Sequence, residues 1–250
     1  NEGVQYGLGA LRSGGITPEQ FVALNEDIGG LDVDINPIPE RTTGDRRALR
    51  NVYRSGAVNM ANNLDEVAII DLRGPDPAIA HDAFRSWALR ARLEEQHGHF
   101  RNHVIWFGLV PLLGDLAYAD EALIAMDRWL AAVERDRSDR PLARKIVANR
   151  PEDLRDRCAQ IDLLEVVELP IVGKVCELGL LQTRYGTPRT VAGEDITTDV
   201  QACRLKPLRR QDYYPISFTD SQWQRLRRTF PDGVCDFSKP GIGQRDTIPW

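Results

Sequence analysis

The sequence has no long apolar run, no excess of positive charge and no clustered cysteines, and each absence narrows the class of protein. Its longest apolar stretch, residues 104–113, is shorter than the about 18 residues that cross a bilayer. A formal net charge of −5 over 250 residues leaves no basic footprint of the kind that binds nucleic acid. No Cys-x-x-Cys motif and no Cys/His spacing typical of zinc ligands occurs. We therefore expect no membrane insertion, no nucleic-acid partner, no metal and no cofactor.

The few cysteines all lie late in the chain, as Cys158, Cys176, Cys203 and Cys235. An even number in a loop-rich region predicts two intramolecular disulfides and an oxidising compartment, so we expect a secreted or periplasmic protein. Four free thiols in a cytosolic protein are the alternative. Sequential pairing, Cys158 with Cys176 and Cys203 with Cys235, is one of the three possible connectivities.

Residues 1–136 alternate helical and strand patterns. Thr17 is followed by Pro18 and, three residues on, by Gln20, which is the signature of a capped helix start. Two short apolar runs, at 66–72 and 103–107, predict strands that are buried on both faces of a sheet. Strand and helix in alternation predict an α/β fold with a parallel sheet and right-handed crossovers. The helices are expected at 17–28, 45–55, 82–96 and 120–135.

Apolar spacing assigns a buried face to the first and last of these helices. In the first, the inward residues are Phe21, Leu24 and Ile28. In the last, the inward residues recur at helical spacing as Leu123, Met126, Trp129, Leu130 and Val133.

Residues 137–250 have more prolines and a broken hydrophobic pattern. They predict short helices at 142–148 and 221–230 and an extended segment at 200–205, after a linker or turn at 138–141. Because the apolar content of this part is thin, it is expected to pack on the first part rather than to fold alone. The sequence thus predicts two domains, 1–136 and a cysteine-containing region at 137–250.

The sharpest chemical signal is the stretch 67–79, an apolar strand followed by Gly74 and then by Asp76 before a proline. Catalytic groups of open α/β sheets collect at the carboxyl ends of strands. A carboxylate there can orient a histidine and stabilise its charged form while a nucleophile loses its proton. The alternative is that Asp76 only caps the turn before the next helix. Asp71, near the end of the strand, is a competing candidate that can instead pair with Arg73 or another cation.

Histidine is scarce, and His81 is the best candidate for a base. It follows Asp76 by five residues and precedes a helix, on the side where the strand ends form a site. Local hydrogen bonding or capping is the other interpretation of His81. His97 and His99 flank a glycine at the far end of that helix and are expected to be exposed to solvent. His103 begins the second strand, where a structural role is expected.

No nucleophile accompanies these residues. The motif Gly-x-Ser-x-Gly, which places a serine on a strained turn between strand and helix, does not occur. The chain begins at Asn1 rather than Met, which favours removal of upstream residues or proteolytic processing of a longer precursor.

Several segments resemble one family. They are residues 3–11 (GVQYGLGAL), 16–25 (ITPEQFVALN), 28–34 (IGGLDVD), 127–130 (DRWL), 203–207 (CRLKP) and 230–242 (FPDGVCDFSKPGI). The chain resembles a poorly characterised group of large secreted bacterial proteins with a domain of unknown function, similar to α/β-hydrolase esterases. The resemblance covers nearly the whole chain, and its closing motif is fairly specific.

The resemblance implies that the chain is the C-terminal part of an α/β-hydrolase-like sheet, with a disulfide-bonded irregular region at its end. It implies an N-terminal half, or a second chain in a heterodimer, that carries the serine and the oxyanion hole. It also implies a late acid and histidine, which map to Asp76 and His81. The loop at 108–119, where such folds usually carry the histidine, has none.

The sequence therefore favours a subunit or fragment of a serine-type carboxylic ester hydrolase that acts on a small-molecule or oligomeric ester. The alternative is a non-catalytic α/β-hydrolase-like protein used for binding or assembly. Residues 1–136 supply only two strands, fewer than a typical α/β sheet, so we expect strands of the partner segment to cover the outer edge.

Overall fold

The computed structural model describes the backbone of residues 2–73, 84–107, 116–162, 165–169, 171–172, 175–176 and 189–249, and side chains outside 116–118 and 159–176. The chain divides into two compact units. Residues Asn1–Met60 and Gly186–Trp250 form one, and Ala61–Tyr185 form the other. This grouping differs from a boundary at residue 136, because the C-terminal third of the chain is shared between the two units. No helix among the described residues is long and apolar enough to cross a membrane.

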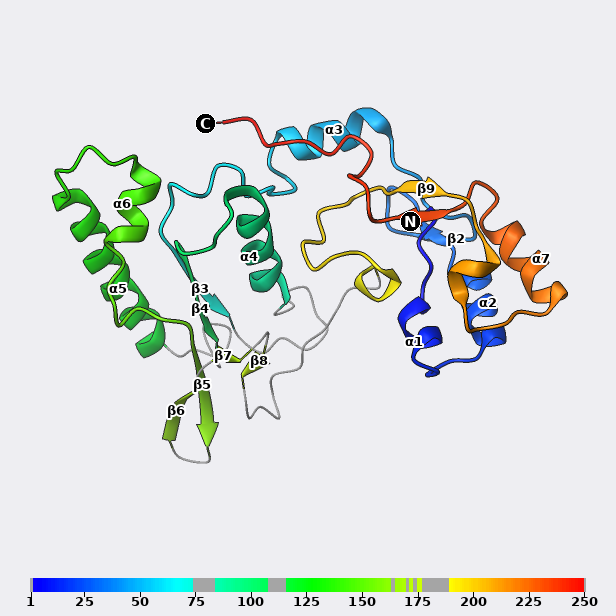
Figure 1. The fold of residues 1–250 in the computed structure, drawn as a ribbon, viewed down its shortest axis with the longest axis horizontal. Helices are drawn as coiled ribbons and strands as arrows, with labels where there is room; N and C mark the ends of the chain where they lie inside the picture. Colours follow the sequence, from blue (N-terminus) through cyan, green and yellow to red (C-terminus); the bar gives the residue numbers. More distant parts are fainter. Residues whose placement is uncertain are drawn as a thin grey trace. The chain divides into compact units, whose positions relative to one another are not determined.

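The unit of residues 61–185 is built on a mixed sheet (Figure 1). Strands β3 (Ile69–Arg73), β4 (His103–Phe107), β5 (Arg157–Asp162) and β6 (Glu165–Leu169) lie in that order. The first three are parallel, and β6 is antiparallel to β5. A separate antiparallel pair joins β7 (Ile171–Val172) to β8 (Val175–Cys176). The predicted α/β class and the parallel pairing of the two apolar strands are confirmed.

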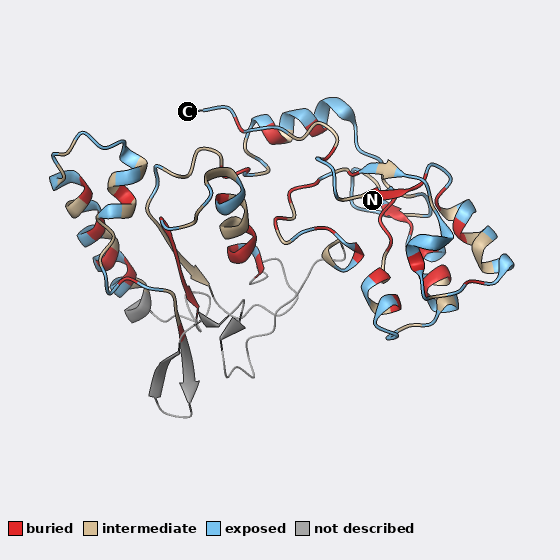
Figure 2. Ribbon diagram, in the orientation of Figure 1, coloured by how far each residue is buried: buried red, intermediate tan, exposed pale blue. Residues whose placement is uncertain are grey.

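Helices cover the two faces of β3 and β4. Alternate residues Ile70 and Leu72 pack into a cluster with helices α5 (Leu116–Arg135) and α6 (Leu142–Ala148). Arg73, on the other face, bonds Ser86 of helix α4 (Phe84–His97). Strand β4 is buried throughout, as predicted, whereas β3 is only half-buried (Figure 2). The expectation that β3 is buried on both faces is therefore wrong, because one face carries charged side chains.

Small residues and aromatic residues form the buried stripe of α5. Ala122, Ala125 and Trp129 are buried, and the Trp129 indole donates to Ile146 O at 2.8 Å, which joins α5 to α6. Leu123 is 70% exposed and Leu130 is 44% exposed, so their predicted inward positions are wrong. Alanine lets α5 approach the sheet closely, and the larger leucines lie beside that contact rather than in it.

The other unit combines the first 60 residues with the C-terminal 65. Its helices are α1 (Leu8–Arg12), α2 (Pro18–Asp27), α3 (Arg46–Arg54) and α7 (Asp220–Thr229), with single turns η1 (Thr190–Ala192) and η2 (Arg210–Tyr213). Its strands form the antiparallel pairs β1 (Gly30–Leu31) with β2 (Pro37–Ile38), and β9 (Arg204–Lys206) with β10 (Val234–Asp236).

Side-chain caps fix where these helices begin. The predicted capping box is confirmed at α2, where the Thr17 hydroxyl accepts from the Gln20 amide and the Gln20 side chain accepts from the Thr17 amide. Thr219 and Gln222 make the same reciprocal pair at α7. Asp45 caps α3 by accepting from the Ala48 amide. Each cap satisfies amide groups that otherwise lack a partner in the first turn.

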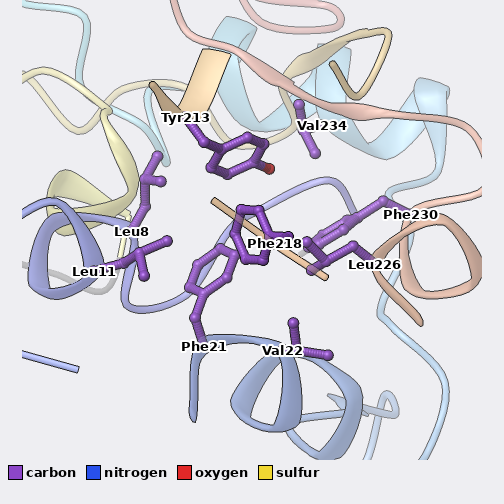
Figure 3. Close-up of a cluster of buried hydrophobic side chains, with 9 residues drawn as sticks. All are labelled: Leu8, Leu11, Phe21, Val22, Tyr213, Phe218, Leu226, Phe230 and Val234. Atoms are coloured by element: carbon purple, nitrogen blue, oxygen red, sulfur yellow. The ribbon is translucent and has the colours of Figure 1, made fainter. Parts of the chain in front are cut away.

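An aromatic core joins the early helices to the end of the chain (Figure 3). The ring centroid of Phe21 lies 6.3 Å from those of both Tyr213 and Phe218. Leu226 of α7 is fully buried in the same cluster. Arg225, which precedes Leu226 in α7, pairs with Glu19 and Glu26 of α2.

The buried face of α2 consists of Phe21, Val22 and Asn25. Leu24 and Ile28 are 39% and 38% exposed, so their predicted burial is wrong. Asn25 takes the inward position because its amide bonds the backbone of Tyr6 in both directions, accepting from the amide at 3.0 Å and donating to the carbonyl at 2.9 Å. A polar residue is tolerated there because its hydrogen bonds are satisfied.

A disulfide closes this unit. Cys203 and Cys235 are bonded, with their Cα atoms 5.3 Å apart, on the segments that pair as β9 and β10. Cys158, in the other unit, is also disulfide-bonded. The expectation of disulfides is confirmed, and the bond between Cys203 and Cys235 belongs to one of the three connectivities that the sequence left open. Such bonds are typical of proteins in oxidising extracellular or periplasmic compartments.

Candidate functional site

The carboxyl ends of β3 and β4 meet at one edge of the parallel sheet. The two strands are in register from Ile69 opposite His103 to Arg73 opposite Phe107. The predicted Asp76 and His81 follow β3 within residues 74–83, which lie outside the described residues, as does most of the loop 108–119. Because catalytic groups of open α/β sheets collect at this edge, their role stays a prediction that the strand arrangement supports.

Four described side chains border this edge. Arg73 Nε donates to Ser86 Oγ at 2.9 Å, which joins the end of β3 to the first turn of α4. The ring centroids of Trp87 and Phe107 are 5.8 Å apart, so α4 also contacts the end of β4. Ser86, Trp87 and Phe107 are buried. The sheet thus fixes both described ends of the connection that contains residues 76 and 81.

A polar network lies on the α4 face of the sheet. His103 Nε2 is 3.3 Å from Asp71 Oδ2, and Ser86 also hydrogen-bonds Asp71. The His103 side chain is fully buried, and that of Asp71 is 18% exposed. Burial alone raises the pKa of Asp71, but hydrogen bonds from His103 and Ser86 and the positive charge of Arg73 outweigh it and hold the pKa below its ordinary value. Asp71 is therefore ionised at neutral pH.

Arg90 extends this network to the segment before β5. Its two Nη atoms bond the two carboxylate oxygens of Asp156 at 2.6 and 2.7 Å, and its Nε donates to His103 Nδ1 at 3.4 Å. Asp156 Oδ1 also accepts from the Ile105 amide at 2.8 Å. The Arg90 guanidinium lies 4.6 Å from the centroid of the Phe100 ring. These contacts fasten α4 to the sheet.

The network joins an aspartate to a histidine, but its geometry does not activate a nucleophile. Arg90 Nε can only donate, so His103 Nδ1 accepts, and Nε2 carries the hydrogen that points at Asp71. Both ring nitrogens are therefore engaged, in a side chain that solvent does not reach. A general base needs a nitrogen within reach of the nucleophile's proton. His103 has the structural role that its position predicts, and Asp71 is its partner.

His97 and His99 lie at the opposite end of α4, next to the amino ends of the strands. Their predicted exposure to solvent is wrong, because both are half-buried. His97 Nε2 is 2.8 Å from Ala61 O, and its Nδ1 is 3.8 Å from Asp65. His99 Nδ1 accepts from the Arg101 amide at 3.4 Å. Neither histidine lies at the carboxyl edge, so neither is a candidate for the base there.

Ser86, Arg90 and Asp156 were not predicted from the sequence as members of a site. One signal was available, because Ser86 and Arg90 are four residues apart and therefore share one face of the helix, next to the buried Trp87. Polar residues on a buried face require partners across the interface. The partner Asp156, 66 residues after Arg90, carries no local signal of this role.

Within the part of the chain that the structure describes, no group of three or more His, Cys, Asp or Glu side chains is placed to hold a metal ion. In the acidic segment that begins at Asp32, the Asp32 carboxylate binds groups of its own loop. Asp32 Oδ1 accepts from the amides of Asp34 and Asn36, and Oδ2 accepts from the Asn36 side chain. These bonds make Asp32 the organiser of its own loop.

Comparison with curated proteins and with solved structures found no match. Comparison with protein families gave a match that spans residues 1–246 and therefore both structural units. Its description is a tannase-like family of unknown function (DUF6351). The match agrees with the resemblance to a poorly characterised family that the sequence motifs indicate. The chain belongs to this tannase-like family.

Proposed function

We propose that the protein takes part in a serine-type carboxylic ester hydrolase, in which Asp76 is the acid and His81 the base. Membership of a tannase-like family supports ester hydrolysis, because tannase is an esterase. The observation that carries the assignment of residues is the parallel pair β3 and β4, in register to Arg73 and Phe107. Asp76 follows three residues after the end of β3, at the edge where such sheets hold their catalytic groups.

The described histidines narrow the search for the base. His103 is locked between Asp71 and Arg90, and His97 and His99 lie at the amino edge of the strands. His81 is the remaining histidine of the chain, and it follows β3 within the connection to α4. This sequence therefore offers one histidine, His81, as the base of the proposed site.

In the proposed reaction, His81 takes the proton of a serine hydroxyl as the serine oxygen attacks the ester carbonyl. Asp76 orients the imidazole and stabilises its positive charge. The alcohol leaves with the proton from His81, and an acyl-enzyme remains. Water then attacks the acyl group, gives its proton to His81 and releases the carboxylic acid while the serine is restored. The substrate class is a carboxylic ester, either small or oligomeric.

The serine comes, in this proposal, from an upstream segment of the same precursor or from a second chain. Among the described strands, β3 pairs with β4 alone, so its other edge lies at the border of the four-stranded sheet. A parallel sheet of α/β type is usually covered and extended beyond three parallel strands. The same proposal places the mature protein in a secreted or periplasmic heterodimer or processed precursor.

The test is the hydrolysis of a simple chromogenic ester by the natural full-length protein. His81→Ala should lower kcat/KM by several orders of magnitude, as loss of a triad base does. Asp76→Asn should lower it by about 10⁴-fold if it disturbs the imidazole tautomer as in serine proteases. Asp127→Asn is the matched control, because Asp127 is exposed on α5 and should leave kcat/KM unchanged.

Thermal unfolding of each variant separates loss of catalysis from loss of folding. Full activity of a folded His81→Ala variant contradicts the assignment of the base. Absence of ester hydrolysis by the wild-type protein, with all esters tried, contradicts the proposed activity and favours a non-catalytic binding role.

A further inference from the structure

A second candidate site lies at the amino edge of the strands, within the unit of residues 61–185. It is a cleft of about 790 Å³ between the turn that follows α4 and helix α6. This volume is within the range of small-molecule sites, which span roughly 300–1,000 Å³. The charged and titratable residues that line it are Asp65, His97, His99, Arg101, Arg140 and Arg144.

The three arginines of this cleft differ from other arginines of the same unit. Arg90, Arg128 and Arg157 each pair with a carboxylate within 2.7 Å. Within the described residues, by contrast, the guanidinium groups lining the cleft have no ion-pair partner. Asp65, the one carboxylate that lines the cleft, lies 3.8 Å from the ring of His97. The chain as a whole is acidic, with a net charge of −5, so its composition does not account for an unbalanced positive cleft.

Hydrogen bonds hold the wall of the cleft formed by the turn after α4. His97 Nε2 bonds Ala61 O at 2.8 Å. The fully buried Asn102 donates to Leu64 O and Val67 O at 2.7 and 2.8 Å, which fixes the segment that carries Asp65 beside Arg101. These bonds hold the backbone that carries Asp65, His97 and Arg101 along this wall.

The opposite wall, at α6, is held in the same way. Lys145 Nζ donates to Asp136 O at 3.0 Å, and Asn149 Nδ2 donates to Asp136 Oδ2 at 2.8 Å. These bonds keep α6 in place at the end of α5, so Arg140 and Arg144 face a cleft of fixed width.

The position of Arg140 and Arg144 is unfavourable for the helix itself. Arg140 precedes α6 and Arg144 is its third residue, and the first turn contains no acidic residue. Positive charge at a helix N-terminus opposes the helix dipole, and like charges four residues apart repel. Both side chains are exposed, and an anion bound between the walls would offset the charge of both.

We propose that this cleft binds a small ligand that carries two or more oxyanion groups, either phosphates or carboxylates. The guanidinium fork matches both groups with paired hydrogen bonds, and two walls of cations suit a ligand with charge at both ends. Strands β3 and β4 are each five residues long, so the cleft and the carboxyl edge are about 17 Å apart along the strands. The cleft is therefore a site of its own rather than part of the proposed catalytic centre.

The test is titration calorimetry of the natural protein with pyrophosphate and with citrate at low ionic strength, and with acetate as the singly charged comparison. We expect pyrophosphate or citrate to bind and acetate not to bind. Which of the two binds more tightly identifies phosphate or carboxylate chemistry. Binding should weaken as sodium chloride is added, because these guanidinium groups are screened by salt.

Variants locate the binding. The double variant Arg140→Gln and Arg144→Gln should weaken binding of the tighter anion by about tenfold or more. It removes two charge-assisted contacts, each of which contributes up to about tenfold in affinity in a partly exposed site. Arg137→Gln is the matched control, because Arg137 lies in the same loop and is exposed but does not line the cleft. The affinity of the Arg137→Gln variant for the same anion should match that of the wild type. The melting temperature of the double variant without ligand should be equal or higher, since unfavourable charges at the start of α6 are removed.

Four results overturn the proposal, and the first three concern the small anions. These are no binding of either multivalent anion, equal weakening by the control and the double variant, and unchanged affinity in a double variant that is folded. Binding of a polyanionic polymer such as heparin in the absence of any binding of pyrophosphate or citrate also overturns it, because the surface is then an extended docking face rather than a small-molecule site.

Discussion

Replacing Arg90 with methionine should destabilise the unit of residues 61–185 by about 2–3 kcal/mol. Breaking a buried ion pair by removing one partner costs about 3–5 kcal/mol, because the other charge is left without compensation. The Arg90 side chain is 12% exposed, whereas that of Asp156 is 32% exposed, so water recovers part of the lost interaction. Methionine keeps much of the apolar contact of the arginine stem with Phe100, which confines the change to the charge and its hydrogen bonds.

The assay is urea unfolding followed by tryptophan fluorescence, since Trp87, Trp106 and Trp129 all lie in this unit. Asp156→Asn and the double variant complete a double-mutant cycle, in which we expect a coupling energy of about 1–2 kcal/mol. Arg128→Met is the matched control. Its pair with Asp153 has the same 2.7 Å separation but side chains that are 54% and 67% exposed, so its loss should cost less than about 1 kcal/mol.

Equal effects of Arg90→Met and Arg128→Met would refute the argument that burial makes the Arg90 pair important. A coupling energy near zero would show that Arg90 stabilises α4 through packing alone. Either result would contradict the view that the ion pair of Arg90 holds α4 against the sheet.

Two further predictions concern stability. Asp71→Asn should reduce the pH dependence of the unfolding free energy in acid. The pKa of Asp71 is lower in the folded protein than in the unfolded chain, where it is about 3.9. The carboxylate therefore stabilises the fold above about pH 3.9, and this stabilisation is lost as the pH falls through the folded pKa. The wild type and variant should therefore converge in acid, and parallel curves would contradict this. The Cys203→Ala and Cys235→Ala double variant should lose about 3–4 kcal/mol, because the bond closes a loop with a sequence separation of 32, and urea unfolding that shows a loss below about 1 kcal/mol would contradict the loop-entropy argument.

The elements that were predicted best are those whose signals are local. Strand β4 and helix α6 have the predicted bounds, and the capping box at Thr17 is present. A run of five apolar residues and a reciprocal cap each specify their own structure within a few residues. The predicted strand β3 is shifted and half-buried, because Asp71 and Arg73 interrupt its apolar run and face α4.

The predicted buried face of α5 is wrong where the prediction assumed that the larger apolar residues are the buried ones. Leu123 and Leu130 are larger than Ala122 and Ala125, yet the alanines are buried and the leucines are exposed. Periodicity allows two neighbouring stripes on α5, and the close approach of the sheet selects the stripe of small residues.

The division into units was beyond local patterns because it depends on contacts across the length of the chain. Phe21 packs against Tyr213 and Phe218, nearly 200 residues later. Arg225 of α7 pairs with Glu19 and Glu26 of α2. Each of these residues looks ordinary in its own segment. Their partners lie far away in the sequence, so only the folded structure shows which residues are in contact.

The pair of Asp71 and His103 resembles part of a catalytic triad, but its contacts give it a structural role. Asp71 and His103 are within hydrogen-bond distance, but Arg90 occupies the second nitrogen of the ring, and this makes the pair a brace. A catalytic pair needs the opposite arrangement, with one nitrogen held by the acid and the other left for the nucleophile. In the proposed active site, Asp76 and His81 are the residues assigned to meet that requirement. An esterase that survives His81→Ala must therefore take its base from outside this chain, because His103 cannot serve without first losing its contact with Arg90.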